Sequence, residues 1–121
     1  MKNTPQEIEK GMIHSNIKLQ QAIEEIPELI NLSAEAEKNY EMSLSRKILE
    51  LKADKIPITI IPKVASGDED VSNLKFKASV ASEMVKIQYR KIKALETAIS
   101  SYQSMHSLRR IEYQKAHIVE T

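Results

Sequence analysis

Cysteine is absent from this chain of 121 residues, and glycine and proline are rare, with two and four copies. Without cysteine there is no disulfide framework, no thiolate metal site and no cysteine nucleophile. A β-sandwich or a βαβ fold needs many more turn residues than this. Tryptophan is also absent and phenylalanine occurs once, and the remaining Ile, Leu, Ala and Met side chains suit seams between helices. We therefore predict an all-α fold in a single domain, residues 1–121.

Long apolar runs and the motifs of common enzymes are also missing. No run approaches the ~18 residues of a membrane span, and the first residues lack the apolar core of a signal peptide, so we expect a cytoplasmic protein without membrane contact. No glycine-rich phosphate loop and no G-x-S-x-G elbow occur. His14, His106 and His117 are not at metal-site spacing from one another, and no Glu has a His three residues later. We expect no catalytic site, no metal and no cofactor, in a protein that is not an enzyme.

The first helix is predicted over about residues 4–53. Thr4, Pro5 and Glu7 match an N-cap, a first helical residue and the third residue of a capping box. Pro27 removes a backbone hydrogen bond, so we expect the first arm to be kinked or briefly broken near residues 24–27. Apolar residues recur at helical spacing along both halves, namely Ile8, Met12, Leu19, Ile23, Ile26, Ile30, Tyr40, Leu44, Ile48 and Leu51.

A connecting segment follows at residues 54–72. Pro57 and Pro62 flank a β-branched run, Ile58-Thr59-Ile60-Ile61, which favours an extended conformation. We predict a short extended segment at 56–62 and a loop at 66–70. Either Asp70 or Ser72 is expected to cap the next helix.

The second helix is predicted over about residues 73–117 and carries two apolar stripes. The first stripe is interrupted only by Gln88 and comprises Ala78, Ala81, Val85, Ile92, Leu95, Ile99 and Tyr102. We expect it to pack against the first helix in a long antiparallel, coiled-coil-like hairpin. Folding back at the loop would bring Leu51 near Leu74, Tyr40 near Val85, Ile30 near Leu95, and Ile8 near Tyr113 or His117.

The second stripe is more than one partner helix can cover. Since large apolar patches are uncommon on soluble monomers, we expect it to form an oligomer seam, with a homodimer favoured and two hairpins closing a four-helix bundle. The seam residues are Val80, Met84, Ile87, Ala94, Ala98, Met105 and Leu108.

The charges are unevenly distributed although the net charge is +1. Six of the seven charged residues in 20–41 are glutamates, whereas residues 75–110 hold eight bases and two acids. An acidic helix lying beside a basic one is one interpretation. The other is a face that binds nucleic acid or an acidic partner, in which cations contact phosphates and rings stack on bases. Its residues would be Lys86, Tyr89, Arg90, Lys91, Lys93, Arg109 and Arg110.

The second helix also resembles a known group of proteins. The run Met84-Val85-Lys86-Ile87-Gln88-Tyr89-Arg90-Lys91-Ile92-Lys93-Ala94-Leu95, with Ala98-Ile99-Ser100 and Gln103-Ser104-Met105, is similar to small helical accessory proteins from early regions of tailed phages and prophages of Gram-positive bacteria. The first helix, with Tyr40 and Leu44, is similar as well. The resemblance covers about two thirds of the chain and rests on a helix pattern. It implies an accessory protein in the host cytoplasm, linked to DNA replication or recombination.

Two functions follow from these observations. The first is a non-enzymatic module that binds another protein as an oligomeric helical hairpin. The alternative is a DNA-binding accessory of phage replication or recombination that uses the basic face of the second helix.

Overall fold

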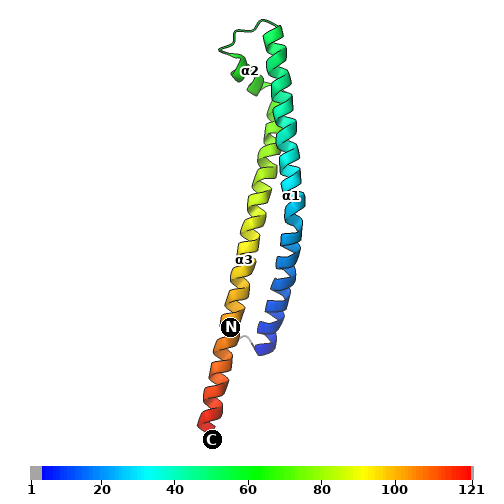
Figure 1. The fold of residues 1–121 in the computed structure, drawn as a ribbon. Helices are drawn as coiled ribbons and strands as arrows, with labels where there is room; N and C mark the ends of the chain where they lie inside the picture. Colours follow the sequence, from blue (N-terminus) through cyan, green and yellow to red (C-terminus); the bar gives the residue numbers. More distant parts are fainter. Residues whose placement is uncertain (1–3, 121) are drawn as a thin grey trace. The chain divides into compact units, whose positions relative to one another are not determined.

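Three helices make up the fold of the computed structural model, which describes residues 4–120. They are α1 (Pro5–Ala53), α2 (Ile61–Gly67) and α3 (Glu69–Glu120) (Figure 1), and no strand occurs within this range. Residues early in α1 contact the later part of α3, whereas Lys47, near the end of α1, contacts Asp68 just before α3. The helices are therefore antiparallel, which confirms the predicted all-α helical hairpin.

The two long helices each contribute to two compact units. Unit 1 contains Met1–Glu25 and Gln88–Thr121, and unit 2 contains Ile26–Ile87. Unit 1 therefore pairs the first part of α1 with the later part of α3. Unit 2 pairs the rest of α1 with the start of α3 and also includes α2.

The capping box at the start of α1 is confirmed. The backbone N–H of Glu7 donates to Oγ1 of Thr4, and the backbone N–H of Thr4 donates to Oε2 of Glu7, both at 3.2 Å. The break considered near residues 24–27 is wrong, because α1 is helical through Pro27. A proline costs one hydrogen bond in a helix interior, and α1 nevertheless continues as one helix from Pro5 to Ala53.

The end of α1 is a Schellman motif with a lysine at its left-handed position. Lys55 has a φ of 59°, its N–H donates to the carbonyl of Lys52, and the N–H of Ile56 donates to the carbonyl of Leu51. Glycine usually occupies this position because it has no Cβ. Ile56 also packs against the cluster that contains Leu51, the apolar contact that accompanies such motifs.

The predicted extended segment at 56–62 and the predicted loop at 66–70 are wrong, because most of these residues lie in helices or turns. A turn closes between Pro57 and Ile60 at 3.1 Å, and α2 begins at Ile61, with Pro62 in its first turn. Proline is tolerated there because the first N–H groups of a helix have no intrahelical partner. The β-branched run was therefore misread as an extended segment.

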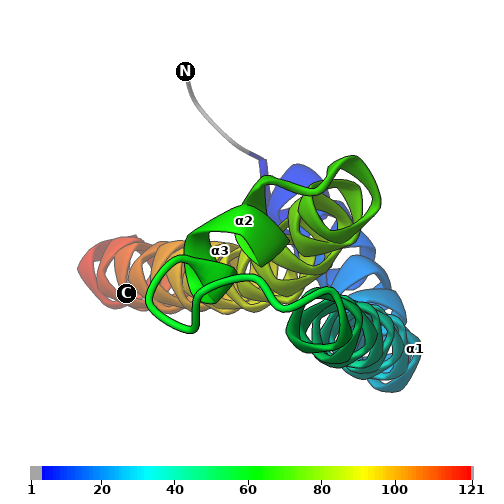
Figure 2. The same ribbon diagram turned by 90° about the horizontal axis from the view of Figure 1, so that it is seen from above.

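The short helix α2 has its own small core in unit 2. Ile61 and Ala65 are buried together with Leu51 of α1, and Leu44, Ile48 and Ile56 pack around them. Seen from above, α2 lies beside the last turns of α1 and the first turns of α3 (Figure 2). The Pro-flanked run thus folds back onto the end of the hairpin.

The cap of α3 is Asp68, and the predicted caps Asp70 and Ser72 are wrong. Oδ2 of Asp68 accepts the N–H of Val71 at 3.2 Å, and its backbone carbonyl accepts the N–H of Ser72 at 2.8 Å. Nζ of Lys47 lies 3.4 Å from Oδ1 of Asp68. The hydrogen bond from Val71, with the ammonium group of Lys47 nearby, holds the pKa of Asp68 below its ordinary value of 3.8.

Small side chains make up most of the α1 side of the seam in unit 1. Ile8, Ser15 and Ala22 are buried at intervals of seven residues, and Ile92 and Gln88 of α3 are buried with them. Nε2 of Gln88 donates to the carbonyl oxygen of Ala22 at 2.9 Å and to Oε2 of Glu25 at 3.0 Å. The polar interruption of the α3 stripe is thus a hydrogen-bonded layer of the seam.

Two residues of the apolar stripe predicted for α1 do not lie in the core. Ile23 and Ile30 are exposed rather than buried. A Cβ at Gly11 would overlap the ring of Tyr102, so a large side chain could not replace this glycine without moving the ring. The first stripe of α3 is confirmed, since its residues from Ala78 to Tyr102 are buried or partly buried.

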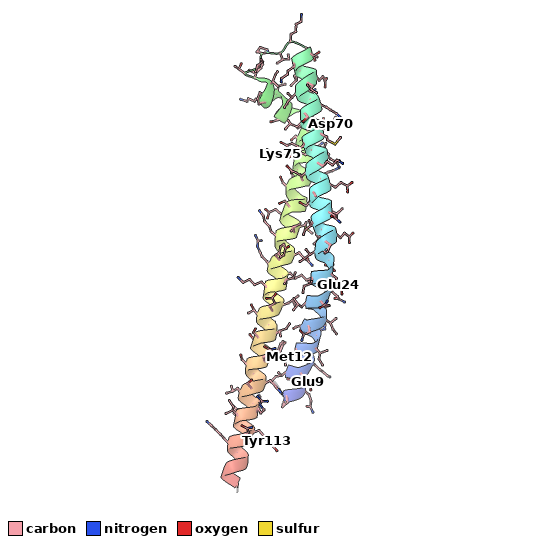
Figure 3. The ribbon with its side chains drawn as sticks, viewed as in Figure 1. Glu9, Met12, Glu24, Asp70, Lys75 and Tyr113 are labelled. Atoms are coloured by element: carbon pink, nitrogen blue, oxygen red, sulfur yellow. The ribbon has the colours of Figure 1, made fainter. Side chains whose placement is uncertain are left out.

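The expected register is wrong by several residues. Gly11 lies against Tyr102 and Ala22 against Gln88, whereas the prediction placed Ile8 near Tyr113. The predicted alignment placed Gly11 level with residue 114, and Tyr102 lies twelve residues before that position. The start of α3 at Glu69, four residues before the predicted start, accounts for part of this shift. As a result α3 continues beyond the first turn of α1 in unit 1, and Tyr113 lies on that continuation (Figure 3).

Replacing Lys55 with glycine is expected to stabilise the protein by roughly 0.5–1 kcal/mol. Glycine removes the Cβ clash of the left-handed conformation, which costs ~1–2 kcal/mol, and part of this gain is offset by the greater freedom of glycine in the unfolded chain. Chemical denaturation would measure the change. Lys52→Gly is the matched control, because Lys52 is helical and glycine there should destabilise by ~1 kcal/mol. A loss of stability in Lys55→Gly would contradict this account of the motif.

The cap at Asp68 should make stability depend on pH. Because its folded pKa is lowered, the carboxylate contributes stability above its unfolded pKa, and this contribution is lost as pH falls through the folded pKa. Asp68→Ser keeps a capping oxygen but removes the charge. The variant should melt below the wild type at pH 7, and the difference in Tm should shrink between pH 4 and pH 2. An equal difference in Tm at every pH would show that the charge contributes nothing.

Candidate functional site

An apolar groove lies between α1 and α3 within unit 2. Its volume is about 340 Å³. Leucines of α1 form one wall, and a row of apolar side chains on α3 forms the other. We call this hollow the unit 2 groove. Its lining residues are Leu29, Leu32, Phe76, Lys77, Val80, Ala81 and Met84.

The α3 wall of the groove follows from its spacing. Phe76, Val80 and Met84 are each four residues apart and therefore project from one side of the helix, and Ile87 continues this side three residues later. All four are exposed, Phe76 to 70%. Across the groove Leu32 is 52% exposed. Apolar side chains of this size in one exposed group are typical of a binding surface.

The predicted seam residues are divided between the two units. Val80 and Met84 line the groove, and Ile87 is exposed on the same side of α3. The remaining four belong to unit 1, where Ala98 and Met105 are partly buried while Ala94 and Leu108 are exposed. Of the predicted seam residues, the structure therefore brings Val80 and Met84 into the groove.

Four groove residues, Lys77 among them, were missed by the sequence interpretation. Phe76 lies one turn before Val80, so the four-residue spacing could have identified it. Leu29 and Leu32 of α1 lay outside the stripe assigned to the core. Their role depends on the register of the two helices, which the apolar pattern did not fix.

A second, polar cleft of about 370 Å³ lies between the same helices in unit 2. Glu37 of α1 and Lys75 and Lys86 of α3 are among the residues that line this cleft. Lys86 donates to Oε1 of Glu83 at 3.1 Å on its own helix. The lining residues are Glu37, Tyr40, Lys75, Ala78, Ser79, Ser82, Glu83 and Lys86.

The predicted basic residues lie at different angles around α3 and are divided between the two units. Lys86 lies in unit 2 and pairs with Glu83, whereas the other six residues lie in unit 1. Tyr89, Arg90 and Lys93 are exposed, and their spacing puts them on adjacent positions of one helix side. Lys91 and Arg110 are exposed at other angles around α3, and Arg109 is partly buried.

Among the described residues, no cluster of three His, Asp or Glu side chains occurs that could hold a metal ion. His14 and His106 are exposed, and the side chain of His117 lies outside the described residues. Within residues 4–120 no helix is long and apolar enough to cross a membrane.

Comparison with known proteins gave no relative. No protein-family model matches the chain, and no curated protein or solved structure is significantly similar to it.

Proposed function

We propose that this protein is a non-enzymatic helical interaction module that binds protein through the unit 2 groove. The observation that carries the proposal is the group of exposed apolar side chains Phe76, Val80, Met84 and Leu32 around one hollow. Full burial of one such side chain contributes ~1.5–3 kcal/mol. Burying several of them together would sustain binding at micromolar concentration or below.

The chemistry of the groove supports binding rather than catalysis. Lys77 is the one ionisable side chain that lines it, so the lining itself offers no acid–base pair for proton transfer. Under this proposal the module forms homo-oligomers, with a dimer favoured, and acts in the cytoplasm. The resemblance of residues 84–105 to early-region phage and prophage proteins supports an accessory role in a phage-infected host cell.

DNA binding is the second candidate. Tyr89, Arg90 and Lys93 support it because all three are exposed together on one side of α3 in unit 1. Two cations next to a ring match the way in which single-strand binders combine phosphate contacts with base stacking.

Charge placed in the groove is expected to abolish protein binding. Val80→Glu puts a carboxylate on the apolar wall, and any partner would have to desolvate it. The tagged wild-type and variant chains would serve as bait in lysates of the producing cells, with bound proteins identified by mass spectrometry. Ser82→Glu is the matched control, because Ser82 lines the polar cleft instead. Circular dichroism would verify that both variants fold. Identical captured proteins from all three baits would overturn the proposal.

The DNA alternative predicts binding that weakens steeply with salt. Arg90→Glu combined with Lys93→Glu should abolish a gel shift of single-stranded DNA at low salt. The control, Lys55→Glu combined with Lys63→Glu, makes the same change in net charge at exposed positions of unit 2. If the wild type shifts no DNA at low salt, or if the control variant loses binding equally, this second candidate is eliminated.

A further inference from the structure

The unit 2 groove has an uneven arrangement of charge that limits what can fill it. Lys77 lines the groove on α3. On α1, Glu28 and Glu35 lie one turn before and one turn after Leu32, so both carboxylates flank the α1 wall. Within residues 4–120, neither Lys77 nor either of these glutamates forms an ion pair. The groove thus has a basic side and an acidic side, and the chain itself leaves both unpaired.

From this arrangement we infer that the occupant of the groove is the same groove of a second copy of this chain. The inference rests on the proposed function and names its partner. A surface with complementary halves can pair with itself about a two-fold axis, since each copy offers what the other lacks. Phe76, Val80 and Met84 of both copies then bury one another, and Lys77 of each copy meets the acidic side of the other.

The direction of the two-fold axis follows from the charges. With the axis along the unit 2 helices, α3 of each copy lies beside α1 of the other, and all neighbouring helices are antiparallel. With the axis across the helices, α3 faces α3 and α1 faces α1. The second arrangement brings Lys77 of one copy near Lys77 of the other, and the glutamates of one copy near those of the other. Such like-charge contacts are unfavourable. The axis therefore runs along the helices.

The register of unit 2 selects Glu35 as the partner of Lys77. Lys47 contacts Asp68 across the hairpin. Because the helices are antiparallel, a residue a given number of positions before Lys47 lies level with the residue the same number of positions after Asp68. Glu35, twelve residues before Lys47, is level with about residue 80, roughly one helical turn from Lys77. Glu28 is level with about residue 87, ~15 Å from Lys77 along the axis. An axial two-fold preserves these levels, so Lys77 of one copy faces Glu35 of the other.

Charge reversal in separate chains tests this pairing. Lys77→Glu and Glu35→Lys each replace two attractions across the dimer by two repulsions, so each variant alone should dimerise roughly tenfold more weakly. Mixed in equal amounts, the two variants form a heterodimer in which both pairs are again opposite in charge. The mixture should therefore recover dimerisation close to that of the wild type. A pairing within one chain would not be restored by mixing.

Sedimentation equilibrium measures the association constants, with circular dichroism to verify folding. Lys63→Glu and Glu41→Lys are the control pair, because both positions are exposed in unit 2 and lie off the groove, and neither should weaken the dimer. A wild type that stays monomeric at high concentration overturns the inference, as does a mixture no stronger than its components. If a monomeric wild type still captures a protein that Val80→Glu loses, the proposed function stands and only the self-pairing fails.

Discussion

Gln88 is a buried amide in an otherwise apolar row, only 7% exposed, and it donates to the carbonyl of Ala22 and the carboxylate of Glu25 across unit 1. Apolar contacts along a helix pair are non-directional and tolerate sliding. The amide does not, because a slip of one turn moves it 5.4 Å and leaves a buried polar group without partners, at a cost of ~1–3 kcal/mol. The pairing of α1 with α3 in unit 1 depends on this bond for its register.

The small side chains of α1 determine which residues remain outside. Gly11, Ser15 and Ala22 occupy the inner side of the helix in unit 1, so large residues such as Ile13 and Ile17 are displaced to the surface. In unit 2, Leu32 of α1 and the row Phe76, Val80 and Met84 of α3 likewise remain exposed. A two-helix pair has no third layer to cover such residues. The exposed apolar groove is therefore a consequence of how the two helices meet.

Local signals predicted local structure well. The capping box of Thr4 and Glu7 and the inner stripe of α3 involve residues within one or two turns of each other, and both were identified from spacing alone. In a sequence, a proline in the first turn of a helix looks the same as one that flanks an extended segment. Pro62 was misread because the contacts of Ile61 and Ala65, which distinguish the two cases, form only in the fold. The register depends on the hydrogen bond of Gln88 to Ala22 and on the ion pair of Asp68 with Lys47. The apolar pattern treats Gln88 as an interruption and Asp68 as part of a loop. Two of the seven groove residues, Val80 and Met84, were found from their spacing, whereas Leu29 and Leu32 join the groove only through the register.

Asp68 lies at the ends of two helices, and this affects how the native state opens locally. It terminates α2 and caps α3, and its side chain is also within reach of Lys47 on α1. A helix end that has its own cap can fray by itself. Here the ends of two helices share one residue, so opening either of them releases the other. We expect the amide protons of α2 and of the first turn of α3 to exchange with solvent as one cooperative group rather than residue by residue.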